Sequence, residues 1–384
     1  MMQKQLLSLF LIVLCLAGCG KNASVSDPLP STTIPSAATP EGVPDPLPEQ
    51  LSKEDPVAAM TDEELVGQLF LAGYPGYDAA LASIESKHIG GYVLFGKYLK
   101  HQTPSGIRRE LEHLQAASSV PLLIAVDEEG GNVTRVSSYP QFRQERFPSP
   151  RTLYDRGGLE MVLDTEREKC QLLHSLGINV NLAPVCDVTT DPDAFMYGRS
   201  LGQSPEITGA YVAAVTELMQ QAQIGSVLKH FPGYGNNDDT HIGAALDTRS
   251  LESLEGNDLV PFRAGIEAGC NAIMVSHTII RALDDTTPGS LSPIVIGYLR
   301  ETMGFDGVIM TDDLSMKAIT DVYGAGESAV LAFLAGNDML CCSKYEEQYD
   351  AVLQAVRDGR ISRERLEQSV LRILQWKQNE QKSE

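Results

Sequence analysis

Short apolar runs alternate with longer helical patterns along most of this chain. Eight runs, rich in β-branched and aliphatic residues, are predicted strands: residues 67–72, 91–95, 122–126, 179–185, 226–228, 272–275, 308–310 and 338–341. Between most of them lie helical stretches, including residues 106–118, 208–221, 251–268 and 325–335. Apolar strands that alternate with helices indicate an α/β fold, with a parallel sheet covered by helices. Eight strands fit a closed (β/α)8 barrel of the TIM type, as one domain, better than an open doubly wound sheet.

Two further helices are expected at the ends of this barrel. Thr61 and Glu64 have the Thr-x-x-Glu spacing of a capping box, which predicts that a helix begins there. Within residues 362–377, Leu366 and Val370 recur on one helical face, which indicates a final amphipathic helix.

The first fifty residues are expected to lie outside the barrel. Lys4 precedes an apolar run from Leu6 to Ala17, which is shorter than the roughly 20 residues that cross a bilayer. Small residues before Cys19 are typical of a lipoprotein signal, although an ordinary secretory peptide is the alternative. We therefore expect a signal peptide (1–18), a lipidated Cys19 with a Pro/Ser/Thr-rich tether (19–50), and a catalytic domain (51–384). This predicts a lipid-anchored protein on the extracytoplasmic face of the cell membrane.

The charge and the cysteines exclude several functional classes. A formal net charge of -21 argues against a nucleic-acid partner, which requires a basic surface. No cysteine spacing resembles a zinc site, so we expect no metal and no cofactor. Cys186, Cys270, Cys341 and Cys342 lie in or beside apolar runs, which favours packed thiols over a disulfide framework.

Polar residues follow five of the predicted strands. They are Asp127 and the acidic run after it, Asp187, Lys229 with His230, His277, and Asp312 with Asp313. A single acidic residue at a strand end is usually a helix cap. Barrel enzymes, however, place their chemistry at the carboxyl ends of the strands, and recurrence at five successive ends indicates a common site.

The residues after the fifth predicted strand combine a turn with a carboxylate and an imidazole. Pro232, Gly233 and Gly235 exclude both helix and strand. Asp239 and His241 are two apart, so the carboxylate could orient the imidazole as a general acid/base. Taken alone, this pattern is more typical of a turn with a surface hydrogen bond.

Residues 229–241, which read Lys-His-Phe-Pro-Gly-Tyr-Gly-Asn-Asn-Asp-Asp-Thr-His, resemble the signature of glycoside hydrolase family 3. In the β-N-acetylhexosaminidase branch this signature commonly reads Lys-His-Phe-Pro-Gly-His-Gly, a spacer, and Asp-Ser-His. Here Tyr234 replaces His, Thr240 replaces Ser, and the spacer is a residue shorter. In other branches the acid/base lies outside the barrel, so Asp239 and His241 favour the hexosaminidase branch.

The resemblance implies a role for each candidate residue. Asp312, which follows Thr311, is implied as the nucleophile, with His241 as acid/base oriented by Asp239. The implied sugar-binding residues are Asp127, Arg135, Arg199, Lys229 and His230. A carboxylate and a guanidinium can together bind several hydroxyls of one pyranose ring. The implied activity is retaining, exo-acting hydrolysis of terminal β-linked N-acetylglucosamine from cell-wall-derived or chitin-like glycans, through a glycosyl-enzyme.

Three alternatives remain open from the sequence. The enzyme could transfer the glycosyl group to phosphate, because a neutral imidazole would not repel an incoming anion. It could be a β-glucosidase of the same family. It could also be a non-catalytic, sugar-binding lipoprotein, although a binder has no need for a nucleophile and an acid together. In each case we expect a monomer whose partners are a carbohydrate and, through lipid, a membrane.

Overall fold

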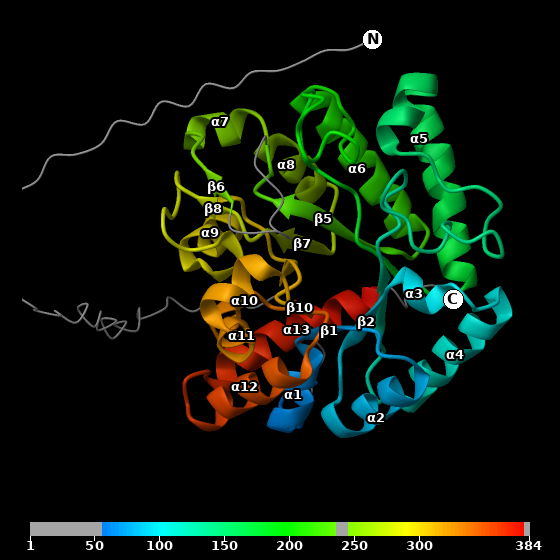
Figure 1. Cartoon of the computed structure of the whole chain (residues 1–384). Helices are drawn as coiled ribbons and strands as arrows, with labels where there is room; N and C mark the ends of the chain where they lie inside the picture. Colours follow the sequence, from blue (N-terminus) through cyan, green and yellow to red (C-terminus); the bar gives the residue numbers. More distant parts are fainter. Residues whose placement is uncertain (1–55, 236–244, 380–384) are drawn as a thin grey trace, which may run out of the picture. The chain divides into compact units, whose positions relative to one another are not determined.

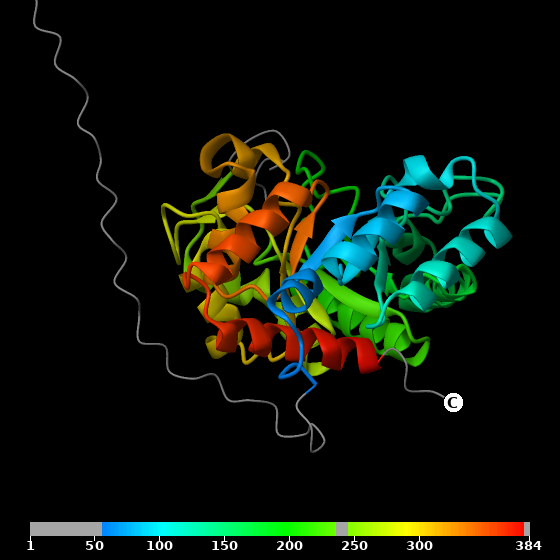
Figure 2. The same ribbon diagram turned by 90° about the horizontal axis from the view of Figure 1, so that it is seen from below.

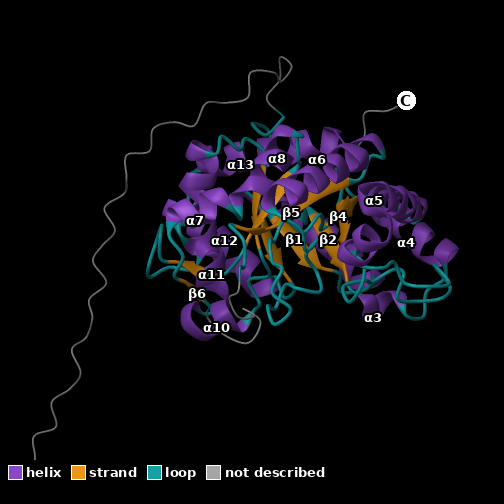
Figure 3. Ribbon diagram, turned by 90° about the horizontal axis from the view of Figure 1, so that it is seen from above, coloured by secondary structure: helices purple, strands orange, loops and turns teal. Residues whose placement is uncertain are grey.

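The strands form the predicted parallel barrel, with its helices outside. The structure is a computed structural model, which describes residues 56–235 and 245–379. Eight parallel strands pair in the order β10-β1-β2-β3-β4-β5-β7-β9. Parallel backbone contacts between Met310 and Met339, and from Leu314 N to Cys341 O, join β9 to β10 and nearly close the barrel. This confirms the predicted TIM-type fold, and Figure 3 shows the strands enclosed by helices.

The strands and helices follow each other in near-regular alternation (Figure 1). The barrel strands are β1 (Phe70–Gly73), β2 (Gly91–Leu94), β3 (Leu123–Val126), β4 (Val180–Asn181), β5 (Gly225–Phe231), β7 (Ala272–Val275), β9 (Val308–Thr311) and β10 (Leu340–Cys342). The helices are α1 (Asp62–Gln68), α2 (Tyr77–Lys87), α3 (Gly96–Leu99), α4 (Pro104–Ala117), α5 (Pro150–Ser175), α6 (Pro205–Gln221), α7 (Leu251–Gly256), α8 (Leu259–Glu267), α9 (Pro293–Gly297), α10 (Lys317–Tyr323), α11 (Ala325–Leu334), α12 (Glu346–Arg357) and α13 (Arg363–Asn379). A small parallel pair, β6 (Leu246–Asp247) and β8 (Ile279–Ile280), lies outside the barrel sheet.

Several helices begin with the same local chemistry. A Ser or Thr N-cap stands directly before a proline, and its side-chain oxygen accepts a hydrogen bond from the backbone N–H three residues later. The N-caps are Thr103, Ser149, Ser204 and Ser292, which begin α4, α5, α6 and α9. Such a cap stabilises a helix by about 1 kcal/mol, and proline is tolerated there because no helical bond needs its missing N–H. The predicted capping box of Thr61 and Glu64 is also present.

Several predicted elements differ from the structure. The fifth strand was expected at 226–228, but it extends over Gly225–Phe231, so Lys229 and His230 lie within it and not after it. The first strand was expected at 67–72, but residues 67–68 end α1 and the strand starts at Phe70. The fourth was expected at 179–185, but the paired strand is shorter, since Pro184 has no N–H to donate to a sheet. The helix expected at 251–268 is two helices, because Asn257 between them is not helical.

The expectations for the cysteines and for the first fifty residues have different outcomes. Cys186, Cys270, Cys341 and Cys342 are buried free thiols, as expected, and Cys170 is a fifth. The signal peptide, Cys19 and the tether lie outside the described residues. Within 56–235 and 245–379, no helix combines the length and apolar character that a membrane span requires.

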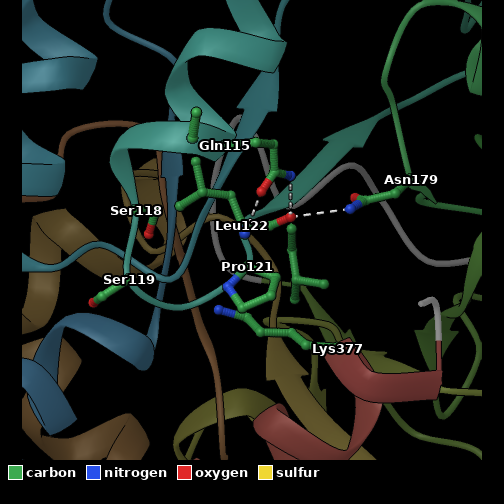
Figure 4. Close-up of a pocket in the computed structure, with 9 residues that line it drawn as sticks. Gln115, Ser118, Ser119, Pro121, Leu122, Asn179 and Lys377 are labelled. Carbon is green, nitrogen blue, oxygen red and sulfur yellow. Dashed lines mark hydrogen bonds between the residues drawn. The ribbon is translucent and has the colours of Figure 1, made fainter. Parts of the chain in front are cut away.

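Helix α13 packs against α1 near the amino-terminal end of the barrel (Figure 2). Its buried Lys377 donates hydrogen bonds to Gln68 Oε1 (2.7 Å) and Gly90 O (2.8 Å). Lys377 also lines a cavity of about 510 Å³. In this cavity Gln115 and Asn179 both donate to Leu122 O at the start of the third strand (Figure 4). These polar groups therefore support the strand ends opposite the predicted site.

The buried Lys377 should make stability depend on pH. Burial lowers the pKa of Lys377 to about 7, whereas in an unfolded chain a lysine titrates near 10.4. Between these values the unfolded state binds more protons, so the free energy of unfolding should rise with pH by up to about 1.4 kcal/mol per unit. Urea unfolding at pH 7, 8 and 9 should show this rise in the wild type and a smaller one in Lys377→Met.

The matched control for this prediction is Lys317→Met, because Lys317 is exposed. It should keep the wild-type pH dependence. An unchanged slope in Lys377→Met would mean that Lys377 stays protonated in the folded protein.

Candidate active site

The carboxyl ends of the barrel strands surround one polar cavity of about 260 Å³. It is lined by six of the predicted site residues, namely Asp127, Arg135, Arg199, Lys229, His230 and Asp312, and also by Asp313. Residues from the third, fourth, fifth and seventh repeats of strand and helix therefore meet at one place. Asp239 and His241, the predicted dyad, lie outside the described residues.

A buried ion network forms one wall of this cavity. Lys229 Nζ lies 2.7 Å from Asp127 Oδ1 and 2.7 Å from Glu129 Oε1. Glu129 in turn accepts two hydrogen bonds from Arg199, from Nε to Oε2 (2.9 Å) and from Nη2 to Oε1 (2.6 Å). Arg135 Nη2 is 3.5 Å from the outer oxygen of Asp127, Oδ2. The network thus holds Asp127, Arg135 and Arg199 at the surface of the cavity.

The charges in this network stabilise each other. Burial alone would raise the pKa of Glu129, but Arg199 and Lys229 hold that pKa well below its usual range. Burial would lower the pKa of Lys229, but Asp127 and Glu129 raise it above its ordinary value. Lys229 and Glu129 are therefore both ionised at neutral pH, although the Lys229 side chain is only 2% exposed and the Glu129 side chain only 1%.

The three successive acids at the end of β3 have different tasks. Asp127 and Glu129, two residues apart, both contact Lys229, as side chains on one face of an extended segment can. Glu128 points elsewhere and accepts backbone N–H bonds from Arg135 (2.8 Å) and Val136 (2.7 Å). It therefore fixes the loop that presents Arg135 to the cavity.

His230 is held between a carboxylate and a guanidinium. Its Nδ1 is 2.8 Å from Asp187 Oδ2 and its Nε2 is 3.0 Å from Arg199 Nη2. An arginine can only donate, so Nε2 accepts and the proton resides on Nδ1. The His230 ring is consequently held in one orientation. Tyr234, which replaces the more common histidine, packs edge-on against it, with ring centroids 5.2 Å apart.

The two aspartates after β9 are oriented differently. Asp313 accepts backbone N–H bonds from Ser315 (2.9 Å) and Ser343 (3.0 Å), and Ser343 Oγ also donates to it. Asp312 accepts a bond from Asp313 N (2.8 Å), and its own N–H is tied to Val275 O (2.9 Å). Asp313 is therefore fixed as part of the turn, although it lines the same cavity as Asp312 and the ion network.

His277 supports this turn. It is fully buried, with Nδ1 2.7 Å from Ser290 Oγ and Nε2 3.0 Å from Asp313 O. A carbonyl oxygen accepts only, so Nε2 carries the proton.

Sequence reasoning missed the roles of two residues. Glu129 lies inside the run from Asp127 to Arg135, and the alternation of side chains along that run could have placed it beside Asp127. Asp187 was noted as a strand-end acid, but nothing in the sequence indicates that its partners are His230 and Tyr234 N, which it contacts at 2.8 and 2.7 Å.

The arrangement suits a neutral polyol more than an ion. Among the described residues that line the cavity, Asp127, Asp312 and Asp313 oppose Arg135, Arg199 and Lys229, so acidic and basic side chains are equal in number. Glu129 lies buried behind Lys229. Carboxylates can accept from hydroxyls and guanidiniums can donate to them. In the described ranges, no group of three or more His, Cys, Asp or Glu residues is placed to hold a metal ion.

Comparison with known proteins gives consistent matches. The family model described as glycosyl hydrolase family 3 N terminal domain matches residues 60–376. The chain is 32% identical over 359 residues to beta-hexosaminidase LpqI of Mycobacterium tuberculosis, covering 90% of each protein. It is 31% identical over 278 residues to a beta-hexosaminidase of Nitrosomonas eutropha, covering 70% of this chain and 78% of that protein.

Solved structures agree with the sequence matches. A family 3 beta-N-acetylglucosaminidase from Paenibacillus sp. str. FPU-7 matches with a TM-score of 0.78 and 36% identity, over 84% of this chain and 63% of that one. The present chain thus spans under two thirds of that protein. The structure of M. tuberculosis LpqI matches with a TM-score of 0.76 and 32% identity, over 83% of this chain and 94% of that one.

Proposed function

This chain belongs to glycoside hydrolase family 3, and from that premise we propose that it is a retaining, exo-acting β-N-acetylhexosaminidase. The family and the beta-hexosaminidase relatives make it a glycoside hydrolase of the hexosaminidase kind. The proposed substrate is terminal β-linked N-acetylglucosamine on cell-wall-derived or chitin-like glycans. Asp312 is the proposed nucleophile, and His241, oriented by Asp239, is the proposed acid/base.

The separation of Asp312 from Asp313 is the observation that carries this proposal. A retaining enzyme needs a carboxylate that can reach the anomeric carbon of a bound sugar. Asp312 and Asp313 both line the cavity that contains Asp127 and Arg135. The carboxylate of Asp313, however, is held by two backbone N–H groups of the neighbouring turn and by the Ser343 hydroxyl. The geometry therefore favours one of two adjacent aspartates for the chemistry.

The proposed reaction has two steps. In the first, an Asp312 oxygen forms a bond to the anomeric carbon while the bond to the leaving oxygen breaks, and His241 donates its proton to that oxygen. In the second, water attacks the same carbon, the ester to Asp312 breaks, and His241 takes the water proton. Inversion occurs twice, so the β configuration is retained. A histidine can replace the usual second carboxylate because its pKa lies near neutrality.

The ion network is the proposed recognition surface for the sugar ring. Asp127 accepts hydrogen bonds, whereas Arg135 and Arg199 donate them, so together they can bind adjacent hydroxyls. Lys229 and His230 also line the cavity, but both residues are buried. We propose that they orient Asp127 and Arg199 in addition to contacting the sugar.

The charge balance of the cavity favours water over phosphate as the acceptor. Lys229 and Arg199 are each paired with the carboxylate of Glu129, and Lys229 also with Asp127. A phosphate dianion would have to compete with these carboxylates. Phosphorolysis therefore stays the second candidate.

A substrate panel tests the proposed activity. Aryl β-N-acetylglucosaminide should be cleaved with a kcat/KM at least about 100-fold above that of the matching aryl β-glucoside, because a site that binds the acetamido group strongly rejects an analogue without it. Added phosphate should produce no N-acetylglucosamine 1-phosphate. Preference for the glucoside, or sugar phosphate as the main product, would select one of the alternative activities.

We also propose that Cys19 carries a lipid anchor, because small residues precede it after a short apolar run. The two chains of a diacylglyceryl group would hold the protein at a membrane, whereas one chain binds only marginally. In cells fed a labelled fatty acid, the wild-type protein should be labelled and fractionate with membranes. Cys19→Ser should lose both properties, and label retained in that variant would contradict the anchor.

A further inference from the structure

A second ion cluster, in which two buried carboxylates bind a partly exposed arginine, lies beside the proposed active site. We call Arg249, Asp247 and Asp258 the Arg249 cluster. Arg249 donates from Nε to both oxygens of Asp247 (3.0 Å each) and from Nη2 to Asp247 Oδ2 (2.6 Å). Its Nη1 donates to Asp258 Oδ2 (2.6 Å), and its Nη2 also donates to Gly233 O (3.1 Å). The guanidinium thus bridges two carboxylates and a backbone carbonyl.

The cluster connects the two described segments on either side of residues 236–244. On the near side, a Cβ at Gly233 would lie 2.6 Å from Asp258 Oδ1, and one at Gly235 would lie 2.5 Å from Arg249 Cζ. Both glycines have positive φ angles (117° and 53°), which other residues rarely adopt. The backbone therefore packs directly on the cluster, and no larger residue fits at either position without movement.

The far side is held by β6 and its partner strand. Ala245 O accepts from Ile279 N (2.9 Å), and Asp247 O accepts from Arg281 N (3.0 Å). Asp247 therefore has a fixed backbone as well as a fixed carboxylate. Arg249 joins this strand to Gly233, which follows the cavity residues Lys229 and His230.

The energetics argue that the cluster is more than a source of stability. Asp247 and Asp258 side chains are each 1% exposed, and Asp258 Oδ1 has no hydrogen-bond partner within the described residues. Burial raises the pKa of Asp258 to about 6, although Arg249 opposes this. Buried ion pairs are often no more stable than apolar side chains of similar volume. Stability alone therefore does not explain why Arg249 is here, whereas the fixed geometry of Gly233, Asp247 and Asp258 does.

We propose that Arg249 is a positioning residue for the acid/base step. Arg249 fixes Gly233 relative to Asp247. It thereby sets the distance between the two described residues that flank the segment containing Asp239 and His241. This inference rests on the proposed role of His241. It predicts that a disturbed cluster impairs proton delivery to the leaving oxygen and spares the attack by Asp312.

The test compares the leaving-group dependence of kcat/KM across aryl β-N-acetylglucosaminides. In Arg249→Lys, substrates with poor leaving groups should lose at least about tenfold, since small misplacement of a catalytic group is costly. Strongly activated substrates should lose less than about threefold, because their departure needs little help from an acid. The slope should lie between those of the wild type and His241→Ala.

The matched control is Arg300→Lys. Arg300 also donates to a buried aspartate, Asp338 (2.6 Å), and to the backbone oxygen of Gly307 (2.9 Å), but these lie at the amino-terminal ends of the strands. This variant should lose stability while keeping the wild-type slope. If Arg249→Lys does not fold, Asp258→Asn takes its place, because it removes one charge from the cluster and retains its shape.

The outcomes separate the inference from the proposed function. A steep slope in His241→Ala with a wild-type slope in the Arg249 or Asp258 variant would overturn the inference alone. An equal loss on all substrates would do the same, since it indicates a general structural role. A wild-type slope in His241→Ala would remove the proposed acid and, with it, the role of Arg249.

Discussion

The ion pair between Glu129 and Lys229 is the interaction on which the rest of the site depends. Both side chains are almost fully buried, so each charge needs opposite charges around it: Arg199 and Lys229 for Glu129, and Asp127 and Glu129 for Lys229. Removing one partner of such a pair typically costs about 3 to 5 kcal/mol, because the remaining charge is left uncompensated. An apolar pair could be as stable, but it could not hold Asp127 and Arg199 at the cavity surface. The desolvation of these buried charges is unfavourable, but it allows the fold to present fixed hydrogen-bond donors and acceptors in the cavity.

Adjacent acidic residues of the site have side chains that point in different directions. Asp127 faces the cavity, whereas Glu128 accepts backbone N–H bonds from the following loop. After β9 both aspartates line the cavity, but only the carboxylate of Asp313 is shown to hold the turn around Ser343. Alternation of side chains along an extended segment produces this division. The ends of β3 and β9 therefore each supply an acidic residue for the site and another that fixes the adjoining loop.

The sequence predicts the barrel and the members of the site better than their contacts. Apolar strand runs, capping residues and polar strand ends are local patterns, and the TIM-type fold, the cap of Thr61 and the meeting of Asp127, Lys229 and Asp312 follow from them. The partners of Asp187 and the bridge made by Arg249 depend on contacts between distant segments. The hydrophobic pattern around Asn257 predicts one continuous helix, and nothing in the neighbouring sequence indicates that Asn257 interrupts it.

Trapping of the glycosyl-enzyme tests the central claim most directly. A slow 5-fluoro sugar of the N-acetylglucosamine series should inactivate the protein, and mass spectrometry of its peptides should place the sugar on Asp312. The same reagent should leave Asp312→Asn unlabelled, while Asp313→Asn, if folded, should still be labelled. Sugar on Asp313 or Glu129, or steady turnover without any adduct, would contradict Asp312 as the nucleophile.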